Sequence, residues 1–252
     1  MKMTQLEMVV DILSDSGSDI INSISDTEES QQVSQILRTT YYEMMAKKNW
    51  PHLRTLTQLD TLSDTTIPTV MQVPDGTKEI VSIAYDTIKV DGTKTVFTNI
   101  EYLEPDCFLA QLNTRDSSKE FTEPMTLNDG AKILIKTDKA PEWWTTFDES
   151  TIIFDSYDNE VDSFLVNDKT QVVLFKTGGS WMFEDSFIPN LPAEFFPALL
   201  AEAKSVAFYV LKQEMNEKAE QQAKRQMVAV STKGNITGID ESYESFGRRG
   251  NK

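Results

Sequence analysis

Two side chains in this 252-residue sequence could serve as a nucleophile or a base near neutral pH: His52, its one histidine, and Cys107, its one cysteine. His52 lies just after a predicted helix, in Asn49-Trp50-Pro51-His52-Leu53-Arg54, where a packing or capping role is more common than catalysis. Cys107 lies near the start of a predicted short helix, a place that can lower a thiol pKa, but we expect a half-buried core cysteine. One cysteine excludes an intramolecular disulfide, and one histidine argues against a four-ligand zinc site.

Two groups of acidic residues raise the question of a calcium site. The first has four acids within eight residues and the second flanks a Ser-Gly-Ser loop: Asp155, Asp158, Glu160 and Asp162; Asp15 and Asp19. Calcium favours such oxygen ligands, but neither group has the glycine and the terminal glutamate of an EF-hand in the required order. We therefore expect solvated loops and predict no metal and no cofactor, with calcium binding at these acids left open.

Other enzyme signatures are weak. Gly178-Gly179 forms neither a P-loop nor a dinucleotide-binding fingerprint and predicts a turn before Trp181. Trp143-Trp144 could form a platform for a sugar, but neighbours on a strand point to opposite faces, which predicts one core ring and one surface ring. The 40 acids could include a carboxylate pair for glycoside hydrolysis, although abundance does not establish geometry. We therefore predict that the protein is not an enzyme.

The composition predicts a soluble globular protein. The chain is 39% hydrophobic and 25% charged, which excludes wholesale disorder. Its 40 acids and 24 bases give a net charge of −16, which opposes sequence-specific binding of DNA or RNA because the chain repels phosphate. No apolar run approaches the roughly 20 residues of a membrane-spanning helix, and residues 1–13 lack the pattern of a signal peptide.

The first 50 residues predict two helices. Thr4 and Glu7 have the spacing of a capping box, and apolar residues then repeat at helical intervals as far as Leu13. Residues 14–25 have loop composition, and a longer helix is expected to start near Ser25 or Asp26. Trp50-Pro51 ends it, because the residue before a proline disfavours the helical conformation.

Residues 67–176 have the composition and the turn signals of a β domain, with one short helix predicted after Pro105. The spacing of the short strands predicts an antiparallel sandwich or a small barrel. The predicted strands are Thr69–Val73, Ile80–Tyr85, Ile88–Val90, Lys132–Lys136, Trp143–Phe147, Thr151–Phe154 and Val172–Lys176.

The last part of the chain predicts one long helix and an extended arm. Pro192 is typical of a first helical position, and the helical pattern runs from Ala193 to about Val230, with Pro197 restarting or kinking it. A helix of this length would reach about 55 Å, so its polar second half is expected to project or to pack on another chain. Residues 212–252 hold eight bases and six acids, which leaves −18 on residues 1–211.

The predicted fold class is therefore α+β: a helical bundle made by the N-terminal helices and the long C-terminal helix, with an inserted antiparallel β domain and a C-terminal arm. The expected boundaries are 1–60 for the N-terminal helices, 61–185 for the β domain, 186–230 for the long helix and 231–252 for the arm. The expected bundle core is Val33, Ile36, Leu37, Tyr41, Met44, Trp50, Phe196, Leu199, Leu200, Val206 and Leu211.

One block near the N-terminus has a familiar pattern. It consists of Asp11-Ile12-Leu13-Ser14-Asp15, Asn22-Ser23-Ile24-Ser25-Asp26-Thr27-Glu28-Glu29-Ser30, Val33, Ile36, Thr39-Thr40-Tyr41-Tyr42-Glu43 and Asn49-Trp50-Pro51-His52-Leu53-Arg54. This block resembles the start of the head-to-tail adaptor (connector) proteins of tailed bacteriophages, the family of tail tubular protein A and the tail accessory factors. The long C-terminal helix with its arm matches the family in placement, whereas the β region departs from the smallest adaptors, which are nearly all helical.

This resemblance implies a structural virion protein that is made in the host cytoplasm and placed at the head–tail interface. Family members form a ring, usually of 12 copies, beneath the portal protein, where they extend the DNA channel and carry the tail nozzle or tail tube proteins. Genomic DNA passes through without sequence-specific binding, and no membrane is involved. The family's C-terminal helix and arm reach the portal, which here implies residues 214–252 and the docking candidates Tyr243, Phe246, Arg248, Arg249 and Lys252.

The negative charge suits that role, because an acidic channel wall would not retain DNA through contacts to phosphate. Like charge also opposes ring closure, so we expect the free protein to be monomeric or weakly associated until the portal is present. Two alternatives stay open: another tail ring, nozzle or tail-completion protein whose main body is the β domain, and a hydrolase that uses carboxylates of that domain.

Overall fold

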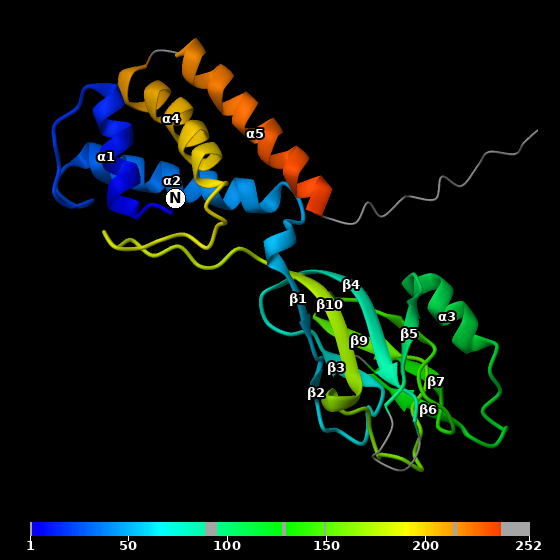
Figure 1. Cartoon of the computed structure of the whole chain (residues 1–252). Coiled ribbons are helices and arrows are strands. Elements are labelled where there is room, and N and C mark those ends of the chain that lie inside the picture. The colour runs from blue at the N-terminus through cyan, green and yellow to red at the C-terminus, as the bar shows by residue number, and fades with distance from the viewer. Residues whose placement is uncertain (1, 89–94, 128–129, 149, 214–215, 238–252) are drawn as a thin grey trace, which may run out of the picture. The chain divides into compact units, whose positions relative to one another are not determined.

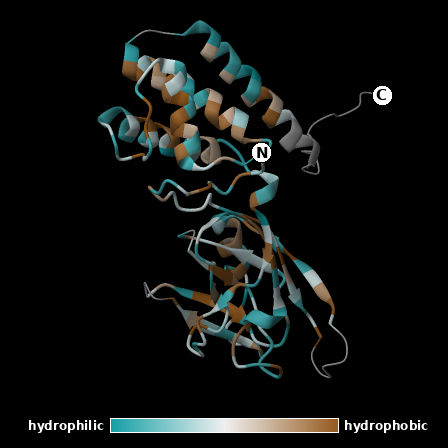
Figure 2. Cartoon of the chain, turned by 60° about the vertical axis from the view of Figure 1, so that its left-hand side comes forward, coloured by the Kyte–Doolittle hydropathy of each residue, from teal (hydrophilic) through white to brown (hydrophobic). Residues whose placement is uncertain are grey.

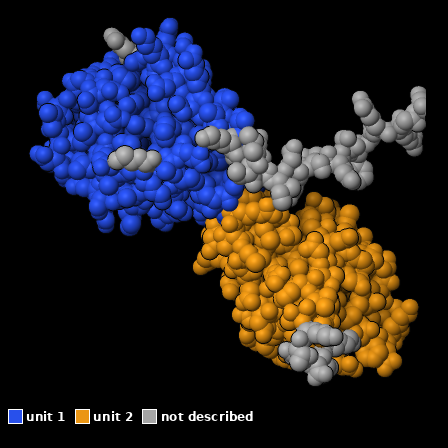
Figure 3. Space-filling view, viewed as in Figure 1, with its two compact units in different colours: residues 1–53, 177–252 blue, residues 54–176 orange. Residues whose placement is uncertain are grey.

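The computed structural model describes residues 2–88, 95–127, 130–148, 150–213 and 216–237, with side chains as far as residue 232. The chain forms two compact units (Figure 3): residues 1–53 with 177–252, here called the helical unit, and residues 54–176, here called the β unit. Among the described residues, four of the five α-helices belong to the helical unit.

The helical unit begins with two capped helices. The first, α1 (Gln5–Ser16), has the expected capping box, in which the backbone N–H of Glu7 donates to Thr4 Oγ1 at 3.2 Å, and it ends at Gly17 in the left-handed conformation. The second, α2 (Glu28–Ala46), is capped by Thr27, whose hydroxyl accepts from the backbone N–H of Ser30 at 3.1 Å. A 3-10 turn, Pro51–Leu53, follows, so the prediction of two N-terminal helices is confirmed.

The prediction of one long C-terminal helix is wrong. The chain instead forms α4 (Phe196–Lys212) and α5 (Glu217–Thr237), and Gln213 ends α4 in the left-handed conformation, with φ of 54°. The two helices lie side by side (Figure 1). This arrangement buries Ala223 and Val230 of α5, which a projecting helix would leave in water.

Most of the residues expected in the bundle core are buried. Seven of its residues are buried: Val33, Leu37, Tyr41, Met44, Trp50, Phe196 and Leu199. Ile36, Leu200 and Leu211 are half-buried. Val206 is 41% exposed, so its assignment to the core is wrong. The helices carry hydrophilic and hydrophobic residues together (Figure 2), as expected for amphipathic helices that share one core.

The β unit contains an eight-stranded sheet and a separate hairpin. The sheet has the order β1-β10-β4-β5-β8-β9-β3-β2, and the hairpin is formed by β6 and β7. The elements are β1 (Arg54–Thr57), β2 (Asp60–Thr61), β3 (Val70–Gln72), β4 (Thr77–Asp86), β5 (Phe97–Tyr102), α3 (Pro105–Asn113), β6 (Thr122–Thr126), β7 (Lys132–Lys136), β8 (Trp143–Thr145), β9 (Thr151–Phe154), a 3-10 turn (Asn167–Lys169) and β10 (Thr170–Lys176).

The sheet curls because the short segment that holds β1 and β2 pairs with strands at both ends of the strand order. β1 and β2 follow each other along the chain, yet β1 pairs with β10 and β2 pairs with β3 at the opposite end of the strand order. Leu59 lies between them, fully buried, and its backbone N–H donates to Thr170 Oγ1 at 3.0 Å. The result is a half-barrel around an apolar core that includes Ile83, Val172 and Phe154.

The predicted fold class is wrong in the relative size of the helical and β parts and in the type of the sheet. A large mixed sheet makes up the β unit, instead of a small antiparallel domain inserted in a dominant helical bundle. β5 and β8 are parallel, with Glu101 beside Trp143 and Tyr102 beside Trp144. Parallel neighbours need a long crossover, and α3 with the β6–β7 hairpin supplies it.

Six of the seven predicted strands overlap observed ones, namely β3, β4, β7, β8, β9 and β10, and the short helix predicted after Pro105 is α3. The strand predicted at Ile88–Val90 is not formed at Ile88, and its other two residues lie outside the described residues. The sequence did not predict β1, β2, β5 or β6.

Candidate functional site

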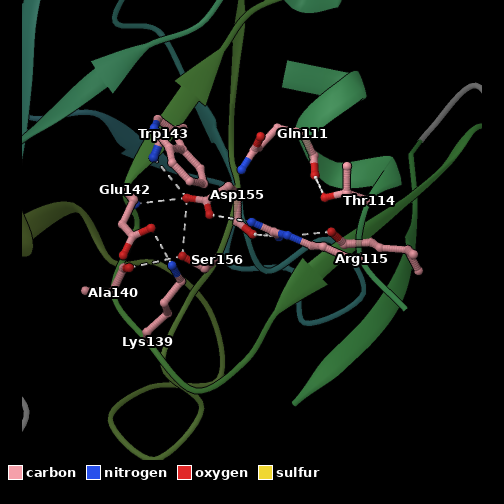
Figure 4. A network of polar contacts seen from close by, with 10 residues as sticks. Gln111, Thr114, Arg115, Lys139, Ala140, Glu142, Trp143, Asp155 and Ser156 are labelled. Atoms are coloured by element: carbon pink, nitrogen blue, oxygen red, sulfur yellow. Dashed lines mark hydrogen bonds and ion pairs between the residues drawn. The ribbon is translucent and has the colours of Figure 1, made fainter. Parts of the chain in front are cut away.

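The acidic group that begins at Asp155 is not an open loop: its first member lies in a buried ion pair (Figure 4). Arg115 Nη2 lies 2.7 Å from Asp155 Oδ2, and Arg115 Nη1 donates to the carbonyl of Leu134 at 3.0 Å. The other carboxylate oxygen of Asp155 accepts from the backbone N–H groups of Glu142 and Trp143, at 2.9 and 3.0 Å. Both charges are therefore hydrogen-bonded on several sides, which is what a buried pair requires.

This network joins four parts of the β unit. Arg115 follows α3, Leu134 lies on β7, Trp143 begins β8 and Asp155 follows β9. Since the pair is engaged within the protein, its position indicates a structural role and not an acid–base one. The prediction of a solvated loop is thus wrong at Asp155. Asp162, in contrast, lies near the surface, with its Oδ2 atom 3.3 Å from Lys169 Nζ. In the described ranges, no group of three or more His, Cys, Asp or Glu residues could hold a metal ion.

His52 and Cys107 lie in different units and take different roles. The His52 ring packs against Phe195, with ring centroids 5.5 Å apart, and burial lowers the pKa of the imidazole. Cys107 is exposed on α3, so the expectation of a half-buried core cysteine is wrong. The packing role expected for His52 is confirmed.

The two tryptophans on β8 differ in burial. Trp144 is 6% exposed and its ring lies 4.8 Å from that of Tyr102, whereas Trp143 is half-buried with Lys139 Nζ 5.7 Å from its ring centroid. Trp144 is thus part of the core cluster of the β unit. The pair does not present two parallel rings at the surface, as a sugar platform would require.

The segment that returns from the β unit, residues 177–195, is a structural feature that sequence reasoning missed. Gly178 lies so close to α2 that an added Cβ would be 2.7 Å from Met45 Cγ and 3.0 Å from Tyr41 Oη. Trp181 donates its backbone N–H to Tyr42 Oη at 2.9 Å and stacks near Tyr41, with centroids 5.4 Å apart. The aromatic residues of this segment are the feature of the sequence that could have predicted its packing against the helices.

The same segment also holds the N-terminus of the chain. The backbone N–H of Gln5 donates to the carbonyl of Phe187 at 2.8 Å, and Asp185 Oδ1 accepts from the backbone N–H of Ile24 at 2.8 Å. Residues 177–195 therefore connect α1, the loop after it and α2 into one unit.

The N-terminal block that resembles the adaptors forms much of the framework of the helical unit. Trp50 Nε1 donates to the carbonyl of Met44 at 2.8 Å, and its ring lies 5.0 Å from that of Phe195. Asp26 Oδ2 accepts from the backbone N–H groups of Asn22 and Ser23, at 2.8 and 2.9 Å. Trp50 and Asp26 of this block thus hold the local backbone in place.

Charge is unequal between the units. The β unit holds 22 acids and 11 bases, a net −11, whereas the helical unit holds 18 acids and 13 bases, a net −5. The predicted docking residues Tyr243, Phe246, Arg248, Arg249 and Lys252 lie outside the described residues. Across the part of the chain that the structure describes, no helix is both long and apolar enough to cross a membrane.

No protein-family model matches the sequence, and no curated protein matches it. Among solved structures, a chain from the neck of an empty GTA particle, computed with C6 symmetry, is similar with a TM-score of 0.26 and 10% identity, over 90% of this chain and 93% of that one. A likeness at this TM-score does not show a shared fold.

Proposed function

We propose that this protein is a structural subunit of a phage-like neck: a head-to-tail adaptor that docks beneath the portal, extends the DNA channel and gives tail proteins an attachment surface. The observation that carries the proposal is the place of the adaptor-like block in the structure. Its helix caps, Trp50 and the 3-10 turn build the helical unit from which α5 leads into the arm.

The positions of the side chains that could take part in catalysis support a role in assembly. His52 is packed against an aromatic ring, Asp155 is neutralised by Arg115, and Cys107 belongs to another unit than His52. We therefore propose that the protein has no catalytic activity, and that its net charge of −16 serves to keep transiting DNA from binding.

The test is attachment to portal-bearing heads that were assembled without this protein. The arm was expected at residues 231–252, but α5 continues to Thr237, so only residues 238–252 are left for it. The intact chain should co-sediment with such heads, and a variant that lacks residues 238–252 should not, because these residues are the proposed portal contact. Equal attachment of both would overturn the portal-docking role of the arm. It would favour the alternative of a nozzle or tail-completion protein, which has its own support in the size of the β unit.

A further inference from the structure

The last two turns of α4 carry an apolar stripe that nothing in the chain covers within the described residues. Val206, Tyr209 and Val210 share one face of the helix and are 41%, 63% and 47% exposed. Beside them, α2 contributes Ile36, Thr39 and Glu43, and the two helices enclose a groove in the helical unit. A groove between two helices with an apolar floor fits a third helix.

α5 presents an outer face that, among the residues the structure describes, has no partner helix in the same copy. Its buried residues Ala223 and Val230 face α4. The opposite side carries residues at a spacing of three and four, all exposed: Lys218, Gln221, Arg225, Val228 and Thr232. Val228 is 66% exposed and lies in the C-terminal half of this stripe. Because this face points away from α4, it cannot fill the groove of its own copy.

The two surfaces are complementary in charge. Glu43 lines the groove, and Glu28 lies one helical turn before the lining residue Gln32 of α2. The outer stripe of α5 carries Lys218 and Arg225. Acidic residues along the groove and basic residues along the helix would steer one into the other and would oppose the pairing of two grooves or of two α5 helices.

We propose that the outer face of α5 in one copy occupies the groove between α2 and α4 in a second copy. The two partners are different surfaces, so the contact is heterologous and repeats from copy to copy until a ring closes. This inference rests on the proposed neck function and names the surface by which the subunits would associate. One helix in one groove is a small interface, which agrees with weak association of the free protein.

The test is directional cross-linking in a Cys107→Ser background, on portal-bearing heads and in concentrated free protein. A double variant, Val210→Cys with Val228→Cys, should give a ladder of multimers with a short bismaleimide. Either single variant alone should give no ladder, because each contact then has one thiol. A matched control, Ile20→Cys with Val228→Cys, places one thiol at a site that is 94% exposed and outside the groove, and should give no ladder.

Charge reversal provides a second measurement. Glu43→Lys or Arg225→Glu alone should lower the ladder yield at least about tenfold, since like charges would then face each other, and the two together should restore it. Absence of a ladder on heads that have bound the protein would overturn the interface and leave the adaptor role intact. A ladder in free protein that does not attach to heads would support the interface and contradict the adaptor role. Ladders of equal yield from the control pair would overturn the interface.

Discussion

Arg115 and Asp155 form a buried ion pair, 2.7 Å between Nη2 and Oδ2, with side chains that are 8% and 0% exposed. The pair joins the end of α3 to the end of β9 and is completed by backbone N–H groups of the segment that enters β8. The crossover that makes β5 and β8 parallel is therefore tied to the end of β9 by a buried charged contact.

Replacing Asp155 with Asn should destabilise the β unit by about 3–5 kcal/mol, because it leaves the Arg115 charge buried without its counter-ion. Urea unfolding followed by tryptophan fluorescence would measure the loss. The control is Lys169→Ala, which removes a partly exposed pair with Asp162 and should cost less than about 1 kcal/mol. Equal costs for the two variants would show that the buried pair has no special role.

Gly178→Ala should destabilise the helical unit by about 1–3 kcal/mol, because the new methyl group overlaps Met45 and Tyr41 in a packed interface. Gly179→Ala is the matched control: its Cβ would meet nothing closer than Asn190 Cβ at 3.9 Å. Thermal unfolding of both variants would compare them. If Gly179→Ala proved the more damaging of the two, the close contact of Gly178 with α2 would be refuted.

Acid should weaken the helical unit through His52. Burial lowers the pKa of this imidazole in the folded state, so the unfolded chain binds the proton more readily. The contribution of His52 to stability is thus complete above about pH 6.5 and is lost as the pH falls from there toward the folded pKa. His52→Phe should reduce the slope of stability against pH between about pH 7.5 and pH 5.5. Parallel slopes for the variant and the parent would contradict the assignment.

The β unit should fold without the rest of the chain. Its first and last residues are neighbours in the sheet, with Arg54 opposite Phe175, so excision leaves no open loop to close. A fragment of residues 54–176 should give a near-ultraviolet circular dichroism signal and one cooperative urea transition. A fragment without tertiary signal would show that the helical unit is needed for the sheet.

Local patterns in the sequence predicted the elements that depend on neighbouring residues. The capping box at Thr4 and the helix after Pro105 are present, because caps and prolines act within one helical turn. The second helix, in contrast, ends at Ala46, before the expected stop at Trp50-Pro51. Six of the seven buried bundle residues lie on α2 and α4, where helical periodicity places them on the core face. The seventh, Trp50, lies after α2.

Features that depend on distant pairing were missed. β1 and β2 are short and mostly polar. β1 becomes a strand only through β10, far along the chain, and β2 only through a short pairing with β3. The helical pattern continues through Gln213, so the break between α4 and α5 was not predicted, and packing against α4 decides it. Asp155 was grouped with its acidic neighbours because the partner that buries it, Arg115, lies 40 residues earlier.

The most direct test of the central claim is negative-stain imaging of this protein mixed with portal-bearing heads that lack it, beside each component alone. The proposed function predicts a collar of added density beneath the portal that follows the portal's symmetry. Heads without added density, with the protein left free in the background, would contradict it.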